Sequence, residues 1–450
     1  MSRVIVIGAG VAGLTAALRL ARAGVGVTLL TKGIGGLQLS QGTVDVLGYQ
    51  TAADRGLRVA DPLTGLGELA AAQPSHPYAR IGADAVRAGV EFLREELGPD
   101  LLVGEADANV LLPTAVGAVR PTCLVQPSML AGSCVPGARF VIVGLRRLKD
   151  FPAGLIAGNL SRAVLDGGQL TARAVTIDVP ARQGEADSSG LTYARAFDDP
   201  AFRERFAAEL RPLVEAGETV GLPAVLGLKD RTAWQHLSEL LGHPVFEIPL
   251  PPPSVPGMRL NLALTAAARA AGVRIVNGSW ATSPSVADGK VTAVSFTTSG
   301  TPREFAGSAF LLAAGGFESG ALSFDSHDEV KETIFGLPLA GTDVPALVHG
   351  DYWGAEQPLF GVGVAVDDTM RVVAPGGGPV YQNLWAAGGV LAGAYRWTEK
   401  SGEGIALGSA VKAADAIAAA LIPSSRPAPG SPPATEIPDQ ARADQTEATA

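Results

Sequence analysis

The first thirty residues alternate between apolar runs and an amphipathic segment. Residues 3–8 form a short β-branched apolar run, which is typical of a buried parallel strand. Residues 11–23 place Leu14, Leu18 and Ala21 on one face at helical spacing. Residues 25–31 form a second apolar run. The pattern therefore predicts a strand, a glycine turn, a helix and a second strand.

Between residues 138 and 253 the pattern becomes a regular alternation of strands and helices. The strands are expected in "RFVIVG", "LTARAVTIDV", "TVGLPAVLGL" and "PVFEIPL". The helices are expected in "FPAGLIAGNLSRAVLDGG", "PAFRERFAAELRPLVEAG" and "TAWQHLSELLG". This alternation predicts a second α/β unit, and the proline-rich run "PLPPPSVPG" ends it.

Helical patterns are also expected at 83–97, 258–272 and 403–421, with strands between the last two. The whole order predicts an α/β fold, a three-layer Rossmann-type domain around a parallel sheet. The domain is expected in two parts, and a cap domain is inserted between them. We expect residues 1–137 and 256–422 to form the nucleotide-binding domain and residues 138–255 to form the cap. The Pro-, Ser- and Ala-rich tail 423–450 is expected to be disordered.

Composition and charge narrow the classes of partner. Of the 450 residues, 47% are hydrophobic, enough for a packed interior, and the net charge of −9 comes without a basic run. Binding of nucleic acid is therefore disfavoured. No uninterrupted apolar run reaches the roughly 18 residues that span a bilayer, and the N-terminus does not read as a signal peptide. A cytoplasmic protein is expected.

The two cysteines and five histidines do not form a metal-binding pattern. Cys123 and Cys134 lie outside any CxxC spacing, and the histidines show no HExxH spacing. Neither an iron–sulfur cluster nor a zinc site held by this chain alone is expected. Low cysteine use fits a reducing compartment.

The turn between the first strand and helix reads Gly8-x-Gly10-x-x-Gly13. In this context Gly8 permits a tight turn, Gly10 lets the backbone approach a phosphate, and Gly13 allows close packing of helix on strand. The helix N-terminus then offers free N–H groups to an anion. The turn predicts a site for a nucleotide phosphate.

The second strand lacks the acid that normally follows such a turn. An Asp or Glu about 20 residues on would accept hydrogen bonds from an adenosine ribose. This strand ends in Thr31 and Lys32, and no acid occurs before Asp45. Lys32 has no acceptor atom, but it can neutralise a phosphate. Three interpretations stay open: a mononucleotide such as FMN, an NADP-type 2′-phosphate, or a dinucleotide such as FAD held by backbone alone.

Several further turns are candidates for cofactor contact. Ser40, Gln41 and Gly42 form a small polar loop that can lie against a planar ring system. The strand "AFLLAA" ends at Gly315, where the chain must turn or approach something closely. The stretch "QNLWAAGG" ends at Gly388 and Gly389, and a helix starts near Gly404. That helix N-terminus can stabilise negative charge on a reduced ring.

Candidate side chains for catalysis are few. His76 in "PSHPYAR" is a candidate proton acceptor, because histidine titrates near neutrality. Arg259, after the proline-rich run, is a candidate for a forked contact with a substrate phosphate. Arg120 has the same status, and Asp351 in "HGDYWG" is either a site acid or a turn residue.

The order of these pieces resembles large flavoproteins whose nucleotide domain is interrupted by a cap, such as fumarate-reductase-like enzymes. More closely, the chain is similar to the family of anaerobic glycerol-3-phosphate dehydrogenase B subunits. The matching stretches include "VIVIGAGVAGLTAALRLARAG", "LSQGTVDVL", "FVIVGLRRLKDF", "PPPSVPGMRL", "AAGGFESGAL" and "NLWAAGGVLAG". They run from residue 1 to about residue 420, and "PPSVPGMRL" and "TKG" are unusual enough to be specific.

The resemblance implies a function and partners that the spacing does not show. It implies a quinone-linked enzyme that oxidises glycerol 3-phosphate to dihydroxyacetone phosphate. The B subunit is assigned FMN. It pairs with an FAD-bearing catalytic A subunit, and an iron–sulfur C subunit attaches the pair to the inner face of the cell membrane. Two alternatives stay open: a non-catalytic subunit that relays electrons, and an independent flavoenzyme acting on another hydroxy or amino compound.

Two stretches depart from the patterns that the resemblance leads us to expect. Broader flavoproteins of this layout carry Gly-Asp at the late turn, and this chain has Gly388-Gly389. The turn before the last helix is expected to be richer in glycine, whereas this chain has "RWTEKSGEG". Both departures concern how a flavin is held.

Overall fold

The computed structural model describes residues 3–50, 57–298, 300–351 and 353–422, and the expected disordered tail lies outside them. A five-stranded parallel sheet organises the first lobe, in the order β11-β2-β1-β15-β20. The strands are β1 (Arg3–Ile7), β2 (Gly26–Thr31), β11 (Arg274–Asn277), β15 (Ala309–Leu312) and β20 (Leu384–Ala386). The chain leaves this sheet after β2 and returns to it with β11, so residues far apart in sequence become neighbouring strands.

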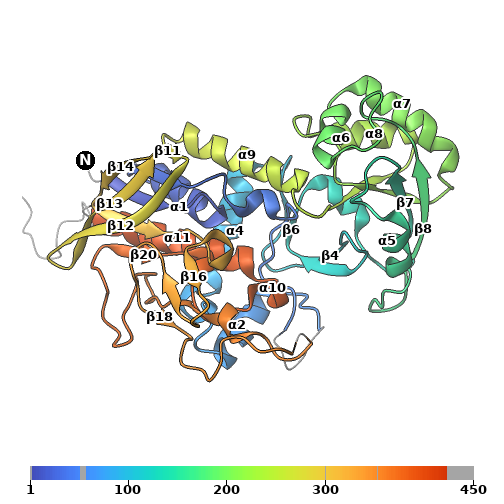
Figure 1. The fold of residues 1–450 in the computed structure, drawn as a ribbon. Coiled ribbons are helices and arrows are strands. Elements are labelled where there is room, and N and C mark those ends of the chain that lie inside the picture. The colour runs from blue at the N-terminus through green and yellow to red at the C-terminus, as the bar shows by residue number, and fades with distance from the viewer. Residues whose placement is uncertain (1–2, 51–56, 299, 352, 423–450) are drawn as a thin grey trace, which may run out of the picture.

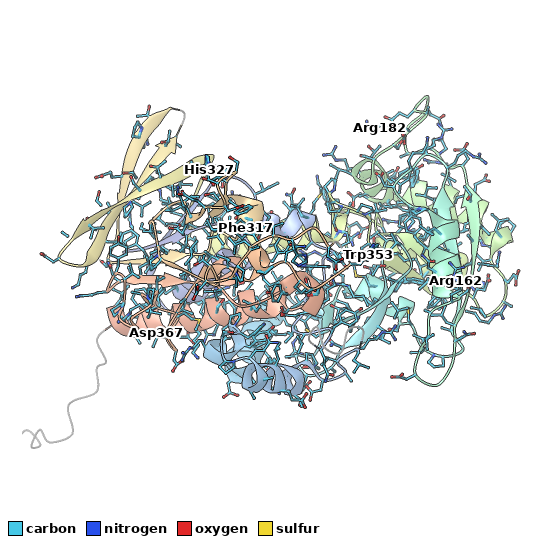
Figure 2. The ribbon with its side chains drawn as sticks, turned by 60° about the horizontal axis from the view of Figure 1, so that its bottom comes forward. Arg162, Arg182, Phe317, His327, Trp353 and Asp367 are labelled. Atoms are coloured by element: carbon cyan, nitrogen blue, oxygen red, sulfur yellow. The ribbon has the colours of Figure 1, made fainter. Side chains whose placement is uncertain are left out.

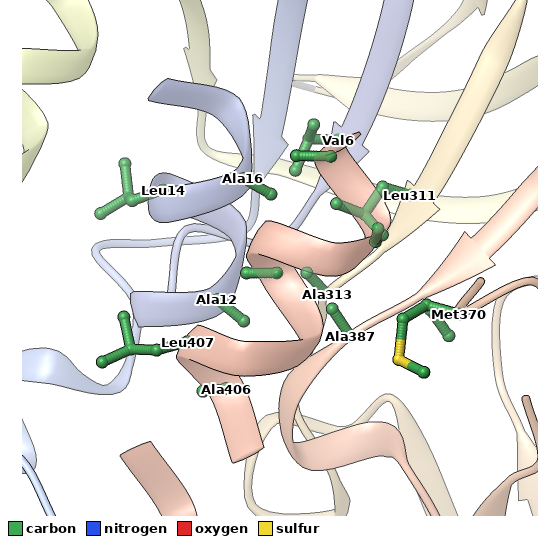
Figure 3. Packing of buried hydrophobic residues seen from close by; sticks show 14 of the residues in the cluster. Val6, Ala12, Leu14, Ala16, Leu311, Ala313, Met370, Ala387, Ala406 and Leu407 are labelled. Atoms are coloured by element: carbon green, nitrogen blue, oxygen red, sulfur yellow. The ribbon is translucent and has the colours of Figure 1, made fainter. Parts of the chain in front are cut away.

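Three helices pack together beside this sheet. They are α1 (Val11–Arg22), α4 (Ala83–Leu97) and α11 (Gly402–Leu421). Small side chains let α1 and α11 approach closely, and Figure 3 shows Ala12 and Ala16 on the side of α1 that faces α11. By length and composition α11 could cross a membrane, but most of it is buried in this core. The sequence pattern had shown no apolar stretch of that length, and the position of α11 identifies it as a core helix.

A second parallel sheet forms the lobe drawn in green in Figure 1. Its order is β10-β9-β7-β8, with β7 (Arg139–Leu145), β8 (Thr171–Ile177), β9 (Thr219–Pro223) and β10 (Val245–Ile248). The helices α5 (Ala153–Leu160), α6 (Gly190–Phe197), α7 (Pro200–Leu210) and α8 (Ala233–Leu241) surround it. This lobe has its own apolar core, in which Phe197 packs against Phe202 and Phe206. Figure 2 shows Arg162 and Arg182 on this lobe and Phe317 and His327 on the other.

The helix α9 (Val255–Ala270) leads from the second lobe back to the first (Figure 1). It begins three residues earlier than the sequence pattern predicted, inside the proline-rich run. Pro256 lies in the first turn, where its missing N–H group would have no partner within the helix. The Ser254 hydroxyl caps the helix by accepting from the Gly257 N–H.

The pattern also overestimated two helices and missed one long strand. The helix expected from residue 151 to 168 is α5, which ends at Leu160, and the helix expected to residue 217 is α7, which ends at Leu210. The missed strand is β12 (Ser279–Ala287), which pairs antiparallel with β13 (Lys290–Thr298), itself paired with β14 (Thr301–Ala306). This three-stranded sheet lies against the cavity described below. The remaining short elements are α2 (Pro62–Ala72), α3 (Tyr78–Ile81), α10 (Arg396–Glu399), β3 (Val103–Gly104), β4 (Val110–Pro113), β5 (Val119–Thr122), β6 (Leu124–Val125), β16 (Leu322–Phe324), β17 (Val330–Glu332), β18 (Leu339–Ala340) and β19 (Gly363–Val364).

Candidate functional site

A cavity of about 620 Å³ opens at the carboxyl ends of the central strands. Ligands bind at this edge of open parallel α/β sheets. The walls come from the ends of β1, β2, β15 and β20, from the first turns of α1 and α11, and from β12 and β13. Four charged side chains line it: Lys32, Glu318, Arg396 and Glu403.

The turn between β1 and α1 forms one wall. Gly8 has a φ of +111°, and a side chain there would clash with the carbonyl oxygen of Ala313. A Cβ on Gly10 would meet no atom within 4 Å, because this position faces open space. Gly13 does not line the cavity but packs against the Gly8 carbonyl, as the predicted packing role requires.

The first turn of α1 leaves backbone donors at this wall. The N-cap is Gly10, no side chain caps the helix, and the first turn contains no acid. The first hydrogen bond within the helix runs from the Leu14 N–H to the Gly10 carbonyl. The preceding N–H groups are therefore the donors that a helix N-terminus offers to an anion.

The end of β2 forms a second wall of the cavity, next to the end of β1. Thr31 uses its hydroxyl within the turn, donating to the Gly33 carbonyl at 2.5 Å. The Lys32 ammonium lies 3.6 Å from the ring centroid of Trp280 on β12, a cation–π contact. A cation over an aromatic ring thus stands where a ribose-binding acid was expected.

The late glycines form the third wall. Gly315, Gly388 and Gly389 all line the cavity, and the first two have φ values of +82° and +78°. The Arg396 guanidinium lies against Gly389, and its Nη1 is 3.7 Å from the Glu318 carboxylate. These turns bring a guanidinium into the cavity.

Three other residues predicted for the cofactor, Gln41, Gly42 and Gly404, do not line the cavity. Their neighbour Ser40 does line it, but its hydroxyl donates to the Leu37 carbonyl at 2.8 Å. A side chain at Gly42 would clash with Pro256. Gly404 packs against the Tyr78 hydroxyl instead of facing the cavity, and α11 begins two residues before it. Close packing against other segments explains why Gly42 and Gly404 are glycines.

His76 is fully buried and lies outside the cavity. Its Nδ1 accepts from the Tyr78 N–H at 3.1 Å, so its Nε2 carries the proton of the neutral ring and faces Glu399 at 3.2 Å. Burial acts to raise the pKa of Glu399, but the bonds from His76 and Ser401 outweigh it and the pKa is lowered. This arrangement gives His76 a structural role, which corrects the predicted role as proton acceptor.

Arg259 is also remote from the cavity lining. Its side chain is 5% exposed and pairs with Glu247, whose side chain is 0% exposed, at 2.6 Å. It also donates to the Gly227 carbonyl at 2.8 Å and to Gln126 at 3.1 Å. The guanidinium is fully engaged between α9 and the second lobe, so the predicted contact with a substrate phosphate is corrected to an internal ion pair.

Two weaker candidates lie outside the lining as well. Arg120 is buried and binds Asp45 and the Thr43 hydroxyl. Asp351 accepts from the Trp353 N–H at 3.1 Å in an exposed turn.

Sequence reasoning missed several lining residues, among them Trp280, Glu318, Arg396 and Glu403. The last two lie in "RWTEKSGEG", directly before and within the first turn of the last helix. Charged residues at a helix start that follows a strand and a Gly-Gly turn were the available signal. Within the described ranges, no group of three or more His, Cys, Asp or Glu is placed to hold a metal.

The chain matches the FAD binding domain family over residues 3–406. The match, the parallel sheet and the open glycine turn define a flavin-binding protein of the α/β class. The open space at Gly10 and the free donors of α1 fit the phosphate of a flavin nucleotide.

Relatives place the chain more narrowly. It is 32% identical over 432 residues to the B subunit of the anaerobic glycerol-3-phosphate dehydrogenase of Pectobacterium carotovorum, covering 92% of this chain and 98% of the relative. It is 33% identical over 431 residues to a Halobacterium salinarum protein named as the probable B subunit of the same kind of enzyme, covering 93% and 98%. The chain belongs to the family of anaerobic glycerol-3-phosphate dehydrogenase B subunits.

Similarity to solved structures is low. The 3-ketosteroid delta1-dehydrogenase of Sterolibacterium denitrificans is 14% identical, with a TM-score of 0.43, covering 93% of this chain and 100% of that one.

Proposed function

We propose that this chain binds one flavin in the cavity and is the B subunit of a quinone-linked dehydrogenase that oxidises glycerol 3-phosphate to dihydroxyacetone phosphate. The observation that carries the proposal is the open turn at Gly8 and Gly10, which shares one cavity with Lys32, Gly389 and Arg396. The family membership supports the substrate. A bound flavin supplies the chemistry that accepts the electrons of the substrate.

The chain's own residues have two roles in the cavity, binding of the flavin phosphate and binding of the substrate phosphate. The N–H groups of α1 and the Lys32 ammonium bind the phosphate of the flavin nucleotide. Arg396, which also lines the cavity, binds the substrate phosphate in a forked contact. This residue takes the role first predicted for Arg259.

We propose FMN as the flavin, with FAD as the alternative. The end of β2 offers Lys32, which lies over Trp280 of β12, and it has no carboxylate to bind an adenosine ribose. Because the matched family is that of an FAD binding domain, the choice needs a direct test. The variant Lys32→Glu restores an acid at this position. We expect it to weaken FMN binding and to strengthen FAD binding relative to the wild type, measured by fluorescence titration of the apoprotein.

The substrate role of Arg396 is tested by Arg396→Gln. The matched control is Arg80→Gln, since Arg80 is 54% exposed, pairs with Asp368 and lies outside the cavity lining. In the assembled enzyme with an artificial electron acceptor, we expect Arg396→Gln to raise KM for glycerol 3-phosphate at least tenfold, and the control to leave it unchanged. An unchanged KM in both variants would remove Arg396 from the substrate site.

The second candidate is a subunit that relays electrons and stabilises its partner. It is favoured by the absence of histidine among the described residues that line the cavity. It predicts that the purified chain, loaded with flavin, does not oxidise glycerol 3-phosphate until a catalytic partner is added. Oxidation by the isolated chain would exclude it.

We further propose the partners and location that this family membership suggests. The partners are an FAD-bearing catalytic subunit and an iron–sulfur subunit that anchors the pair at the inner face of the cell membrane. The burial of α11 supports attachment through a partner instead of through this helix. Co-purification of all three chains from the membrane fraction would test this arrangement.

A further inference from the structure

The cavity contains two carboxyl side chains with different surroundings. Glu318 is 62% exposed and lies beside Arg396. Glu403, in the first turn of α11, is half-buried and lines the cavity together with Ala406 and Gly388. Among the ion pairs of the described segments, none involves Glu403. Glu403 is therefore a cavity acid without a pairing cation.

The groups around Glu403 explain why no cation neutralises it. The N–H of Gly404 donates to the Asp45 carbonyl at 3.0 Å, which holds the start of α11 against the buried Asp45. The nearby Arg120 is engaged by Asp45 and by the Thr43 hydroxyl. A second carboxylate thus reaches Glu403 while the guanidinium beside it is already paired.

Three further titratable groups face this cluster. Lys400 precedes α11, and burial, followed by the charge of Arg120, lowers its pKa. Tyr78 and Cys123 are buried beside the acids, and burial raises the pKa of both, so they stay neutral near pH 7. Glu403 is a carboxyl of this cluster whose pKa moves toward neutrality. Burial, followed by the charge of Asp45, raises its pKa from 4.5 to about 7, against the opposing effect of Arg120.

We propose that Glu403, in its protonated form, donates a hydrogen bond to an acceptor atom of the flavin bound in the cavity, so that flavin binding takes up one proton. This proposal rests on the proposed function, since it requires the flavin in this cavity. A flavin presents carbonyl oxygens and unprotonated ring nitrogens, which accept hydrogen bonds. A carboxylate facing them would repel their lone pairs and lose its water when the ligand covers it. The protonated acid removes both costs and adds a donor.

The test measures flavin affinity of the full-length apoprotein against pH. FMN and, separately, FAD are titrated into the wild type, Glu403→Gln and the control Glu318→Gln from pH 6 to pH 9, with quenching of flavin fluorescence as the readout. Glutamine is a fit replacement because its amide is a permanent neutral donor. For the wild type we expect a constant Kd below about pH 7 and a rise approaching tenfold per pH unit above it, as uptake of one proton requires.

The variants distinguish the contribution of Glu403 to the pH dependence of Kd from the contributions of other titrating groups. Glu403→Gln is expected to bind flavin with the affinity of the wild type at low pH and to lose the rise in Kd above pH 7. Glu318→Gln is expected to keep that rise. The flavin phosphate titrates near pH 6, but it does so equally with every variant and cancels in the comparison. Calorimetry at pH 8 in buffers of different ionisation enthalpy should show close to one proton taken up by the wild type and none by Glu403→Gln.

Results that contradict the role of Glu403 differ from results that contradict the proposed function. A wild-type Kd that does not change with pH, or a Glu403→Gln variant that keeps the wild-type rise, would overturn the role of Glu403 and leave the flavin site intact. Failure of the folded wild type to bind FMN or FAD at any pH would instead overturn the proposed function.

Discussion

Replacement of Arg259 by methionine tests whether this residue belongs to the interior or to the active site. Methionine keeps much of the length of the side chain but removes the charge, and it leaves Glu247 buried without its cation. Glu247 would keep the bonds from the Ser128 hydroxyl at 2.6 Å and from the Leu226 N–H at 2.7 Å. Breaking a buried ion pair from one side costs about 3–5 kcal/mol.

The assay is thermal unfolding followed by circular dichroism. A loss of 1 kcal/mol lowers the unfolding midpoint of a domain of about 150–250 residues by roughly 2–4 °C. Arg259→Met should therefore lower the midpoint by roughly 10 °C. The control Arg19→Met breaks a pair with Asp415 that is 35% and 53% exposed, and it should cost about 1 kcal/mol or less. Adding Glu247→Leu to Arg259→Met removes the unpaired charge and should restore part of the loss.

One combination of results would refute a structural role for Arg259. It consists of an Arg259→Met protein with the wild-type unfolding midpoint and a raised KM for glycerol 3-phosphate. That outcome would return Arg259 to the substrate site, where the sequence first placed it.

Three further changes test other parts of the structure. Gly8→Ala should destabilise the protein by more than about 2 kcal/mol, because Gly8 has a positive φ and a side chain there would clash with the backbone. Gly10→Ala should change the stability by about 1 kcal/mol at most but weaken flavin binding. Urea unfolding measures the stability of both variants, and fluorescence titration measures the flavin affinity. Glu403 has a folded-state pKa above the ordinary 4.5, so its contribution to the stability of the fold falls as pH rises from 4.5 to about 7. The apoprotein of Glu403→Gln should therefore gain stability relative to the wild type through this window, by roughly 3 kcal/mol at pH 8. An equal difference in stability at pH 4 and pH 8 would contradict this. Burial raises the pKa of the thiols of Cys123 and Cys134, the latter to about 12, so a disulfide reagent at pH 8 should label neither until the protein is denatured.

The parts of the fold that local patterns determine were predictable. The helix at 83–97 has the predicted bounds, and β1, α1 and β2 differ from the prediction by one residue at an end. These segments have strong apolar periodicity and glycine turns. The strand at Ser279–Ala287 was missed because "SWATSPSVA" contains a proline and few large apolar residues, and its pairing with β13 stabilises it.

The site was predictable where the backbone itself defines it. Gly8 and Gly10 have a fixed spacing after a strand, and the structure places both at the cavity. Side-chain roles depended on contacts that spacing does not reveal. His76 pairs with Glu399, 323 positions away, and Arg259 contacts Gln126, 133 positions away. Because of these contacts, His76 and Arg259 are buried structural residues, although both were chemically plausible candidates for catalysis.

The glycines of the predicted flavin loop illustrate a second limit. A glycine marks close approach, but the sequence does not say whether a ligand or another segment approaches. At Gly42 the neighbour is Pro256, and at Gly404 it is Tyr78. At Gly10 a Cβ would meet no atom within 4 Å, and because this position also lines the cavity it stays a predicted ligand contact.

The central claim is that the cavity at the end of β1 holds one flavin. The most direct measurement is the mass and amount of the chromophore released when the purified full-length protein, reconstituted with a mixture of FMN and FAD, is denatured. The account predicts one flavin per chain, with the mass of FMN. Release of FAD would contradict the role assigned to Lys32 and Trp280. A folded protein that stays colourless after reconstitution with both flavins would contradict the account as a whole.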